Sequence, residues 1–391
     1  MEGKEKKRLI LAQLIFLTAF PALATDMYLP ALPTLAENLT APVAVVNLTL
    51  ALFFVFFGAS MIIWGTLSDK YGRRPMLLVG TAIYVLASLL CAFAGDVYQL
   101  IVFRIIQAIG SGAAVTVSMA CMKDIFQDKE RERALAISNI LFALAPVIAP
   151  VIGALILKVA TWRSIFHILM GFGVVGFVNC LFMDESAPMT EGKSLIKTLG
   201  NLGKVLKNPG FFYPLLLFSS LSFPMMLFLG SSSSIYIIGF GLSEQKYSLF
   251  FSANAVFMAL GPVLFLVLSR HISSFKILKY GFIIVFLGGC FMVLLGNRNP
   301  FFFAASVLPA LIATQMLRPP SVNILFEQGR DDAGAASSLM SFTGLFFGGM
   351  MAFFISLDWN NRILVYGIVN IAVGLLCSAF WPRVWKKCSM G

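Results

Sequence analysis

The sequence predicts an all-α integral membrane protein with twelve transmembrane helices arranged as two halves of six. Three observations favour this fold class. The 391 residues are 59% hydrophobic and only 12% charged, with a mean hydropathy of +0.89, whereas soluble domains carry about 25% charged residues. Apolar runs of about 20 residues, enough to span a bilayer, recur along the whole chain. A basic polar segment interrupts them near the middle.

The apolar runs and the charges between them predict the number and direction of the spans. We expect spans at residues 9–32, 43–67, 75–95, 98–122, 134–158, 163–183, 211–239, 246–269, 276–296, 300–327, 334–357 and 361–382. Twenty-two of the 29 Lys and Arg residues then fall on one side of the membrane and five on the other. Because positive residues concentrate on the cytoplasmic side, both termini are expected in the cytoplasm. The net charge of +11 therefore reflects orientation and indicates no nucleic-acid partner.

The polar segment 184–210 predicts the division into halves, with residues 1–183 before it and 211–391 after it. It is basic and amphipathic, so we expect a cytoplasmic linker with a helix that lies on the membrane surface. A weak internal repeat supports two halves, since GTLSDKYGRRPMLLVG at 65–80 aligns without gaps with LVLSRHISSFKILKYG at 266–281. Parallel repeats of six spans around a substrate path are a common transporter architecture.

Charged residues inside a span are costly, so each is a candidate for function. Asp26 is the carboxylate that lies well inside a predicted span, and Arg104 enters another span from the outer side. At about 1.5 Å per residue, both fall at a similar depth in the outer half of the membrane. They are expected to face each other, unless Asp26 only ends the first helix before Pro30 and Pro33, or Arg104 only binds backbone carbonyl groups.

Other polar residues within the spans are candidates for a substrate path. Arg318 precedes two prolines near the inner end of its span, where it either extends to the cytoplasm or lines the path. Tyr28, Asn47 and Gln107 bring polar groups into the first half, where such groups join helices or line a cavity. We assign all four residues to the path.

Two stretches rich in Gly and Pro are candidates for moving parts. The fifth span contains APVIAPVIGA at 145–154. Pro146 and Pro150 are expected to kink this helix, and the small Ala149 and Gly153 to allow close packing against a neighbour. The stretch GTLSDKYGRRP at 65–75 is predicted to be a short charged loop that forms salt bridges in one conformation and loses them in another. Its glycines and charged residues are Gly65, Asp69, Gly72, Arg73 and Arg74.

The stretch 65–75 resembles the signature loop of the major facilitator superfamily, between its second and third helices. Three further stretches, in order, resemble signatures of the Bcr/CflA-type drug-resistance transporters within it. They are TDMYLPALP (25–33) in the first helix, FRIIQAIGSGAA (103–114) in the fourth, with Ala108 where Gly is usual, and APVIAPVIGA in the fifth. DDAGAASSLMSF (331–342) is similar to the start of the subfamily's eleventh helix.

The resemblance implies proton-coupled efflux of small, largely apolar or amphipathic compounds, which is multidrug or antibiotic antiport. It implies alternating access across a bacterial inner membrane by a monomer whose partners are the substrate, protons and the lipid bilayer. No cofactor, metal or nucleic acid is expected. Export of one endogenous metabolite, such as a siderophore or a sugar, is the alternative that the resemblance leaves open.

Carried over residue by residue, the resemblance makes Asp26 the protonated group and Arg104 the residue that influences its proton affinity. Asp69, Arg73 and Asp124 match a cytoplasmic charge cluster that holds the outward-open conformation. A carboxyl group in a low-dielectric medium favours its neutral form, and a nearby cation favours the ionised form. A pair of this kind, whose separation changes between two conformations, takes up and releases a proton.

Other function classes lack the residues that they require. A membrane-embedded enzyme or receptor would need a catalytic constellation, but the chain has only two His, no HExxH motif and no paired carboxylates within its spans. A channel would need a filter-like sequence or a ring of charge, and neither is present. The six Cys have no metal-ligand spacing. Transport is therefore the predicted class of function.

Overall fold

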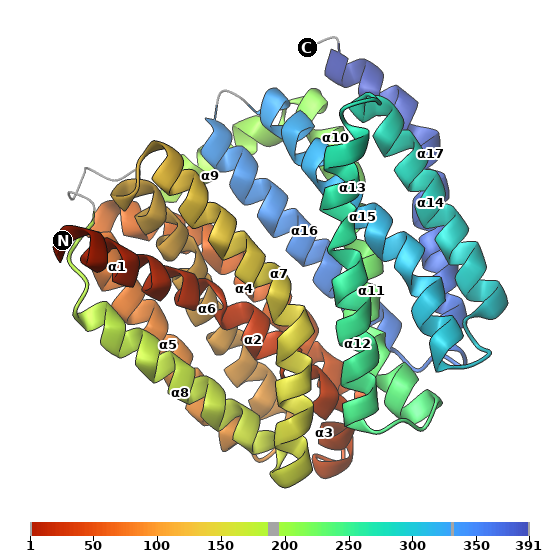
Figure 1. Cartoon of the computed structure of the whole chain (residues 1–391), viewed down its shortest axis with the longest axis horizontal. Coiled ribbons are helices and arrows are strands. Elements are labelled where there is room, and N and C mark those ends of the chain that lie inside the picture. Colours follow the sequence, from red (N-terminus) through yellow and green to blue (C-terminus); the bar gives the residue numbers. More distant parts are fainter. Residues whose placement is uncertain (1, 187–194, 330–331, 390–391) are drawn as a thin grey trace. The chain divides into compact units, whose positions relative to one another are not determined.

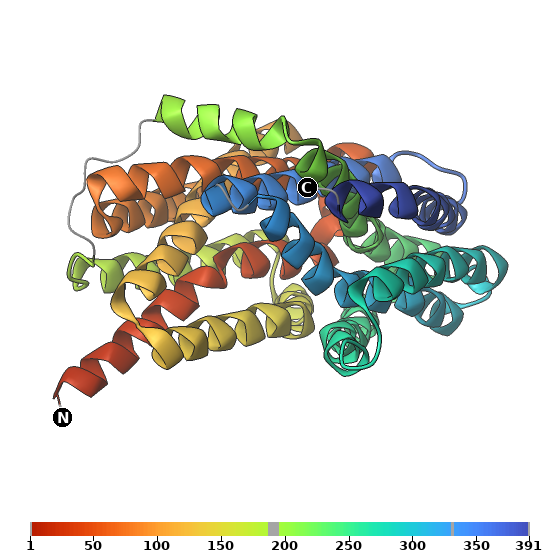
Figure 2. The same ribbon diagram turned by 90° about the horizontal axis from the view of Figure 1, so that it is seen from above.

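The computed structural model describes residues 2–186, 195–329 and 332–389, and Figure 1 and Figure 2 show it from two directions. Every regular element in these ranges is a helix. Eleven helical segments are long and apolar enough to cross a membrane, and Leu144–Val159 is a shorter apolar segment within a long helix. The all-α multi-pass membrane fold predicted from composition is confirmed.

The chain divides into two compact units, Met1–Thr198 and Leu199–Gly391. The first contains α1 (Glu2–Thr18), α2 (Phe20–Asp26), η1 (Leu29–Ala31), α3 (Leu32–Asn38), α4 (Val43–Tyr71), α5 (Arg73–Ala92), α6 (Val97–Ile125), α7 (Asp128–Val159) and α8 (Trp162–Leu181). The second contains α10 (Pro209–Ser219), η2 (Ser220–Ser222), α11 (Phe223–Ser233), η3 (Ser234–Gly239), α12 (Glu244–Met258), α13 (Leu260–Leu268), α14 (Ser274–Leu295), α15 (Pro300–Gln328), α16 (Ala333–Ser356) and α17 (Arg362–Ser389).

The helix α9 (Leu195–Leu206) crosses the boundary between the units. Leu202 and Val205 on this helix are buried, whereas Lys204 is exposed, so α9 is amphipathic as its sequence indicates. Residues 187–194 of the predicted linker and residue 331 of the predicted eleventh-helix signature lie outside the described residues. The exact linker boundaries, 184–210, stay a prediction.

The first span runs over Leu9–Asn38 and is interrupted, whereas the sequence predicted a helix that ends at residue 32. The segments α1, α2, η1 and α3 follow one another along it. Pro21, Pro30 and Pro33 each lie in the first two positions of a segment, where the missing amide hydrogen leaves no bond unmade. These prolines restart the helix instead of ending it. Asp26 therefore lies inside the span and does not mark its outer end.

The seventh span, Pro209–Gly239, is interrupted in a similar way. It consists of α10, the short η2, α11 and the π-helical η3. The helix α11 begins with Phe223 and Pro224, just as α2 begins with Phe20 and Pro21. In transporters built from repeats, interrupted spans at corresponding positions of the two halves are the best indicator of the substrate region.

The charged stretch 65–75 is not a loop, so that prediction was wrong. The helix α4 continues to Tyr71 and α5 begins at Arg73, ahead of the predicted Pro75, so Gly72 alone joins them. No helix-breaking residue stands between Gly65 and Gly72, and the polar residues there extend the helix. Gly72 has a φ of 93°, a conformation that glycine adopts readily and other residues rarely do.

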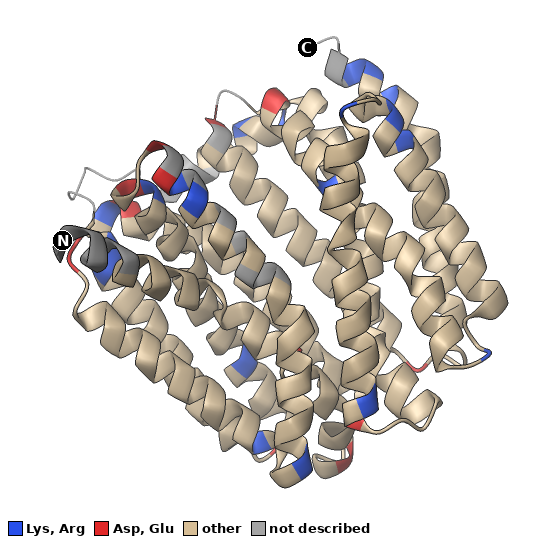
Figure 3. Ribbon diagram, in the orientation of Figure 1, with Lys and Arg blue, Asp and Glu red and all other residues tan. Residues whose placement is uncertain are grey.

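Charged residues gather at one end of the helices in each unit (Figure 3). In the first unit this end carries the N-terminus, and in the second unit it carries the C-terminus. Only scattered charged residues lie at the opposite ends. The placement of both termini in the cytoplasm stays a prediction.

Candidate functional site

Asp26 is the last residue of α2, and 5% of it is exposed. Its Oδ1 lies 3.0 Å from Thr25 Oγ1, and the same Oγ1 lies 3.0 Å from the carbonyl oxygen of Pro21. Neither of the ion pairs found among the described residues involves Asp26. Asp26 is therefore a buried acid at a break in a membrane helix, with a hydroxyl group as its polar neighbour.

Arg104 is fully buried on α6. Its Nη1 donates to the carbonyl oxygen of Ala24 at 3.0 Å and to Gln107 Oε1 at 2.7 Å. Its Cζ lies 4.8 Å from the centroid of the Tyr28 ring and 4.3 Å from that of Phe53, distances at which a cation is attracted to an aromatic ring. Nε and Nη2 have no hydrogen-bond partner, which is costly for a buried cation.

Arg104 contacts the backbone of the helical turn that ends at Asp26. The side chains of Arg104 and Asp26 do not form an ion pair. The guanidinium group binds the backbone at Ala24, two residues before the acid. Sequence reasoning placed the two residues at a similar depth, and this contact agrees with that placement. The direct pairing is absent from this conformation, in which aromatic rings and a backbone carbonyl group hold the cation.

The predicted path residues of the first unit are all buried, and Tyr28 and Gln107 contact Arg104. Gln107 Nε2 donates to Ser88 Oγ at 2.8 Å, and the Tyr28 hydroxyl group lies 2.8 Å from Thr49 Oγ1. Asn47 is 2% exposed, and neither atom of its amide has a hydrogen-bond partner. Because all three residues are buried, they do not line an open path in this conformation. Arg318 belongs to the second unit, where its side chain is exposed.

The fifth-helix signature lies on α7, which runs unbroken through Pro146 and Pro150. A Cβ atom added to Gly153 would clash with the backbone carbonyl group of Met27. Met27 directly follows Asp26, so the close packing that the signature predicted is directed at the break in the first span. A larger residue at position 153 would push this backbone away.

A similar close contact between two helices occurs in the second unit. There the glycine lies on the interrupted span instead of on the helix that packs against it. A Cβ atom added to Gly230 of α11 would lie 2.5 Å from the carbonyl oxygen of Ala352 in α16. When Phe20 and Pro21 are aligned with Phe223 and Pro224, Gly230 takes the position of Met27. Sequence reasoning missed this relationship, although the shared Phe-Pro pair was a signal for it.

The predicted gate residues meet at the joint between α4 and α5, apart from Gly65, which lies earlier on α4 next to Thr116 of α6. Arg73 Nη1 lies 2.6 Å from Asp69 Oδ1, and Arg73 Nε lies 2.9 Å from Asp124 Oδ2. Arg74 Nη2 donates to the carbonyl oxygen of Leu181 at the end of α8 at 2.7 Å. One arginine thus joins α4, α5 and α6, and the next joins α5 to α8.

Sequence reasoning missed Glu185, which completes this cluster. Its two carboxylate oxygens accept hydrogen bonds from the backbone amides of Arg73 at 2.8 Å and of Arg74 at 3.1 Å. These amides begin α5 and have no partner within the helix, and a negative charge is favourable at a helix N-terminus. Glu185 is more than 110 residues away in sequence, and an acidic residue just after the sixth span was the only available signal.

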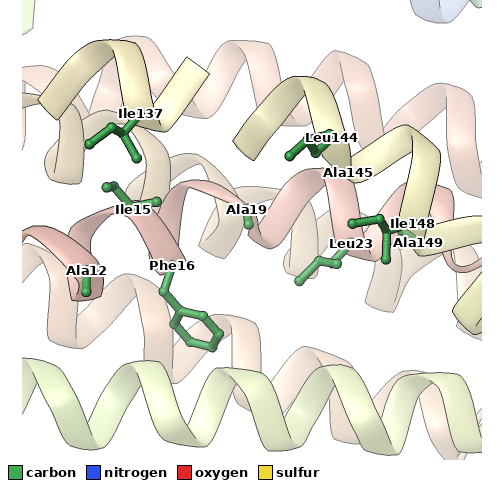
Figure 4. A pocket seen from close by; sticks show the side chains of 10 residues that line it. All are labelled: Ala12, Ile15, Phe16, Ala19, Leu23, Ile137, Leu144, Ala145, Ile148 and Ala149. Carbon is green, nitrogen blue, oxygen red and sulfur yellow. The ribbon is translucent and has the colours of Figure 1, made fainter. Parts of the chain in front are cut away.

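An apolar pocket of about 480 Å³ lies beside the interrupted first span. Figure 4 shows that its labelled side chains come from α1, α2 and the turn between them, and from α7. Phe16, Ala19 and Leu23 line one side, and Leu144 and Ala149 lie on the other. The volume is within the range of small-molecule sites, about 300–1,000 Å³. Its lining suits an apolar chemical group.

Comparisons with known proteins agree with the signatures. A family model described as the Major Facilitator Superfamily matches residues 14–353. The chain is 26% identical over 391 residues to an uncharacterised MFS-type transporter, YdgK, of Bacillus subtilis (strain 168), and the match covers 96% of each chain. It is 30% identical over 244 residues to the multidrug resistance protein MdtL of Klebsiella pneumoniae (strain 342), a match that covers 62% of each chain.

Solved structures of similar fold are also transporters. A bacterial homologue of the human lysosomal transporter Spinster, in an inward-facing and occupied conformation, matches with a TM-score of 0.76 and 15% identity over 98% of this chain and 97% of that chain. The D-xylose–proton symporter matches with a TM-score of 0.71 and 13% identity over 94% of this chain and 96% of that chain. At such identities these matches show the fold alone.

Proposed function

The chain belongs to the major facilitator superfamily of membrane transporters, and from this premise we propose that it exports small, largely apolar or amphipathic compounds in exchange for protons. The observation that carries the proposal is the position of Asp26, a buried acid inside the first span at a break in the helix. Ionisable residues inside membrane spans commonly mark proton relays. The partial match to proteins named multidrug resistance protein MdtL supports the substrate class.

Thr25 gives Asp26 a hydrogen-bond partner in both protonation states. When Asp26 is ionised, the Thr25 hydroxyl group donates to Oδ1 at 3.0 Å. When Asp26 is protonated, the same hydroxyl oxygen accepts a hydrogen bond from the acid and its O–H donates to the carbonyl oxygen of Pro21. A serine or threonine hydroxyl group can do both because it is a donor and an acceptor. The acid can therefore change its charge without losing its neighbour.

Arg104 supplies the opposing charge in the proposed cycle. Two of its nitrogen atoms have no hydrogen-bond partner, and its backbone contact at Ala24 is two residues from the acid. A rearrangement that brings the guanidinium group to the carboxyl group favours the ionised acid and releases the proton. When Arg104 returns to its contacts with Ala24 and Gln107, Asp26 favours its neutral form and takes up a proton.

The helix contacts around Asp26 provide a route by which the proton and the conformation are coupled. Gly153 of α7 lies against Met27, so a change at the acid acts directly on the fifth span. The cluster of Asp69, Arg73, Asp124 and Glu185 at the other end of the unit holds α4, α5 and α6 together. We assign it the role of a latch that stabilises one conformation.

The apolar pocket beside the first span supports a largely apolar substrate, because its lining offers no charged partner. We place the transporter in a bacterial inner membrane as a monomer with both termini in the cytoplasm. Export of one endogenous metabolite, such as a siderophore or a sugar, is the alternative. A narrow substrate range in the experiment below would favour it.

The test is proton exchange in proteoliposomes that carry an imposed pH gradient. Lipophilic cations and neutral antibiotics are added one at a time, and the internal pH is followed for the wild type, Asp26→Asn and Glu37→Gln. Glu37 is an exposed acid on α3 of the same span and is the matched control. We expect some compounds to dissipate the gradient with the wild type and Glu37→Gln but not with Asp26→Asn. Undiminished exchange by Asp26→Asn would contradict the proposal.

A further inference from the structure

Two packed helices of the second unit, α14 and α17, carry basic residues at one end and no acidic residue along their whole lengths. Lys276 and Lys279 lie in the first two turns of α14. Arg383, Lys386 and Lys387 lie in the last two turns of α17. Neither helix contains an Asp or a Glu, whereas basic and acidic residues lie side by side at the charged end of the first unit (Figure 3). The two helices therefore concentrate positive charge without offsetting it.

Aromatic contacts hold the two basic segments at the same end of the helix pair. The centroid of the Phe275 ring lies 5.7 Å from that of Trp381 and 5.4 Å from that of Trp385. Trp381 Nε1 also donates to the carbonyl oxygen of Phe275 at 3.1 Å. Lys279 lies one turn after Phe275, and Arg383 lies between the two tryptophans in the sequence. The start of α14 and the end of α17 thus lie side by side.

Three of these cations have no anionic partner in the part of the chain that the structure describes. Lys276, Lys279 and Arg383 are exposed, and neither of the ion pairs found there involves them. The helix α14 has no acidic residue in its first turn and no side-chain hydrogen bond at its N-cap, Ser273. Positive charge is unfavourable at the N-terminus of a helix, where the helix dipole is already positive. An anion from outside the chain would stabilise this end.

An exposed apolar stripe leads away from the basic residues along each helix. On α14 it consists of residues three or four apart, a spacing that places them on one helix face: Tyr280, Ile284, Leu287, Phe291 and Leu294. Lys276 lies four residues before the first of them and continues the stripe at the basic end. On α17, the exposed Leu376, Phe380 and Arg383 follow the same spacing. A membrane lipid has its groups in the same order, with a charged head next to apolar chains.

Aromatic residues between the basic end and the apolar stripes mark the level of the lipid head groups. Tyr280 is 53% exposed, and Trp385 is half-buried against Phe275. Tyr and Trp are enriched where the membrane meets water, because their rings are apolar and their tips are polar. The basic residues therefore lie at the depth at which a lipid carries its phosphate group.

We propose that an anionic phospholipid binds at this end of the second unit, with its phosphate group at Lys276, Lys279 and Arg383 and its acyl chains along the apolar stripes of α14 and α17. Clusters of Lys and Arg beside a transmembrane helix attract anionic lipids in this way. A zwitterionic lipid has no net negative charge and is attracted less. The site takes no part in proton exchange, so this inference is independent of the proposed function.

The test counts bound lipid molecules by native mass spectrometry of the purified full chain in a neutral detergent. Phosphatidylglycerol, which is anionic, and phosphatidylcholine, which is zwitterionic, are titrated separately with identical acyl chains. We expect the wild type to bind phosphatidylglycerol more tightly, with a preference that falls as the salt concentration rises. Lys279→Gln and Arg383→Gln should each weaken its binding by about fivefold, equivalent to about 1 kcal/mol for each charge removed. The triple variant with Lys276→Gln should lose the preference.

The matched control removes three exposed basic residues of the first unit, Lys123→Gln, Arg131→Gln and Arg133→Gln. It loses the same charge as the first triple variant and should bind phosphatidylglycerol like the wild type. Equal binding of the two lipids by the wild type, or equal losses in the two triple variants, would overturn the proposal. Glycerol phosphate carries the phosphate group without acyl chains and should not displace the lipid. If it does, the residues bind a free phosphate, and the assignment to a lipid is wrong.

Discussion

Gly153 of the fifth span lies against the backbone of Met27, the residue that follows the buried acid Asp26. This contact connects the antiporter-type signature on α7 to the interrupted first span. A buried helix crossing this close has no space for a side chain, because protein interiors are closely packed. The fifth span is thus placed to respond to changes at the acid.

Gly153→Ala is expected to displace the backbone at Met27 and to lower proton exchange several-fold. Overpacking of this kind costs about 1–3 kcal/mol of stability, so thermal unfolding should also shift downward. Gly171→Ala on α8 is the matched control, because a Cβ atom there meets nothing within 4 Å. Equal exchange by both variants would show that the contact has no role in coupling.

Thr25→Val removes the hydroxyl group next to Asp26 while conserving the shape of the side chain. We expect a several-fold loss of proton-coupled exchange, because the acid then lacks the neighbour that adapts to both of its protonation states. Thr25→Ser restores the hydroxyl group and should recover most of the exchange. A Thr25→Val transporter as active as the wild type in proteoliposomes would remove this group from the pathway.

Gln107→Glu gives the buried Arg104 a carboxylate at the position where it now has an amide oxygen, 2.7 Å from Nη1. Hydrogen bonds between charged groups are roughly twice as strong as neutral ones, so the guanidinium group should be held in place. Exchange should fall several-fold while the thermal unfolding temperature does not fall. If exchange is unaffected, Arg104 has a structural role and does not move toward Asp26.

Glu185→Gln should loosen the start of α5. The variant keeps one acceptor oxygen and turns an NH₂ group toward the amides of Arg73 and Arg74, which are donors. Hydrogen–deuterium exchange at these amides should speed up by about tenfold, equivalent to 1.4 kcal/mol. Glu327→Gln changes an exposed acid at the end of α15 and should leave the hydrogen–deuterium exchange rate at these amides unchanged. If hydrogen–deuterium exchange at these amides is the same in Glu185→Gln as in the wild type, the Glu185 carboxylate does not stabilise the joint between α4 and α5.

Much of the fold followed from apolar length alone, because a lipid environment requires each span to be a long, apolar helix. The predicted limits of the second unit's first span, 211–239, differ little from Pro209–Gly239. The first span was predicted too short because Pro30 and Pro33 suggest an end, whereas they begin new helical segments. The stretch around Gly72 was predicted to be a loop because its charged residues suggested that the helix ends before them.

The candidate site was predictable only in part, since its signatures name residues and not their partners. Asp26 and Arg104 can be identified from the sequence because a charged residue inside a membrane span is energetically costly. The absence of an ion pair between them depends on where Ala24, Phe53 and Gln107 place the guanidinium group.

The most direct measurement of the central claim is proton release on substrate binding by the purified transporter in weakly buffered solution. The ligand is the compound that most strongly dissipates the gradient in proteoliposomes. The proposed mechanism predicts that the wild type and Glu37→Gln release protons when they bind it. Asp26→Asn is predicted to bind the compound and release none. Equal proton release by Asp26→Asn would contradict the assignment of Asp26 as the proton carrier.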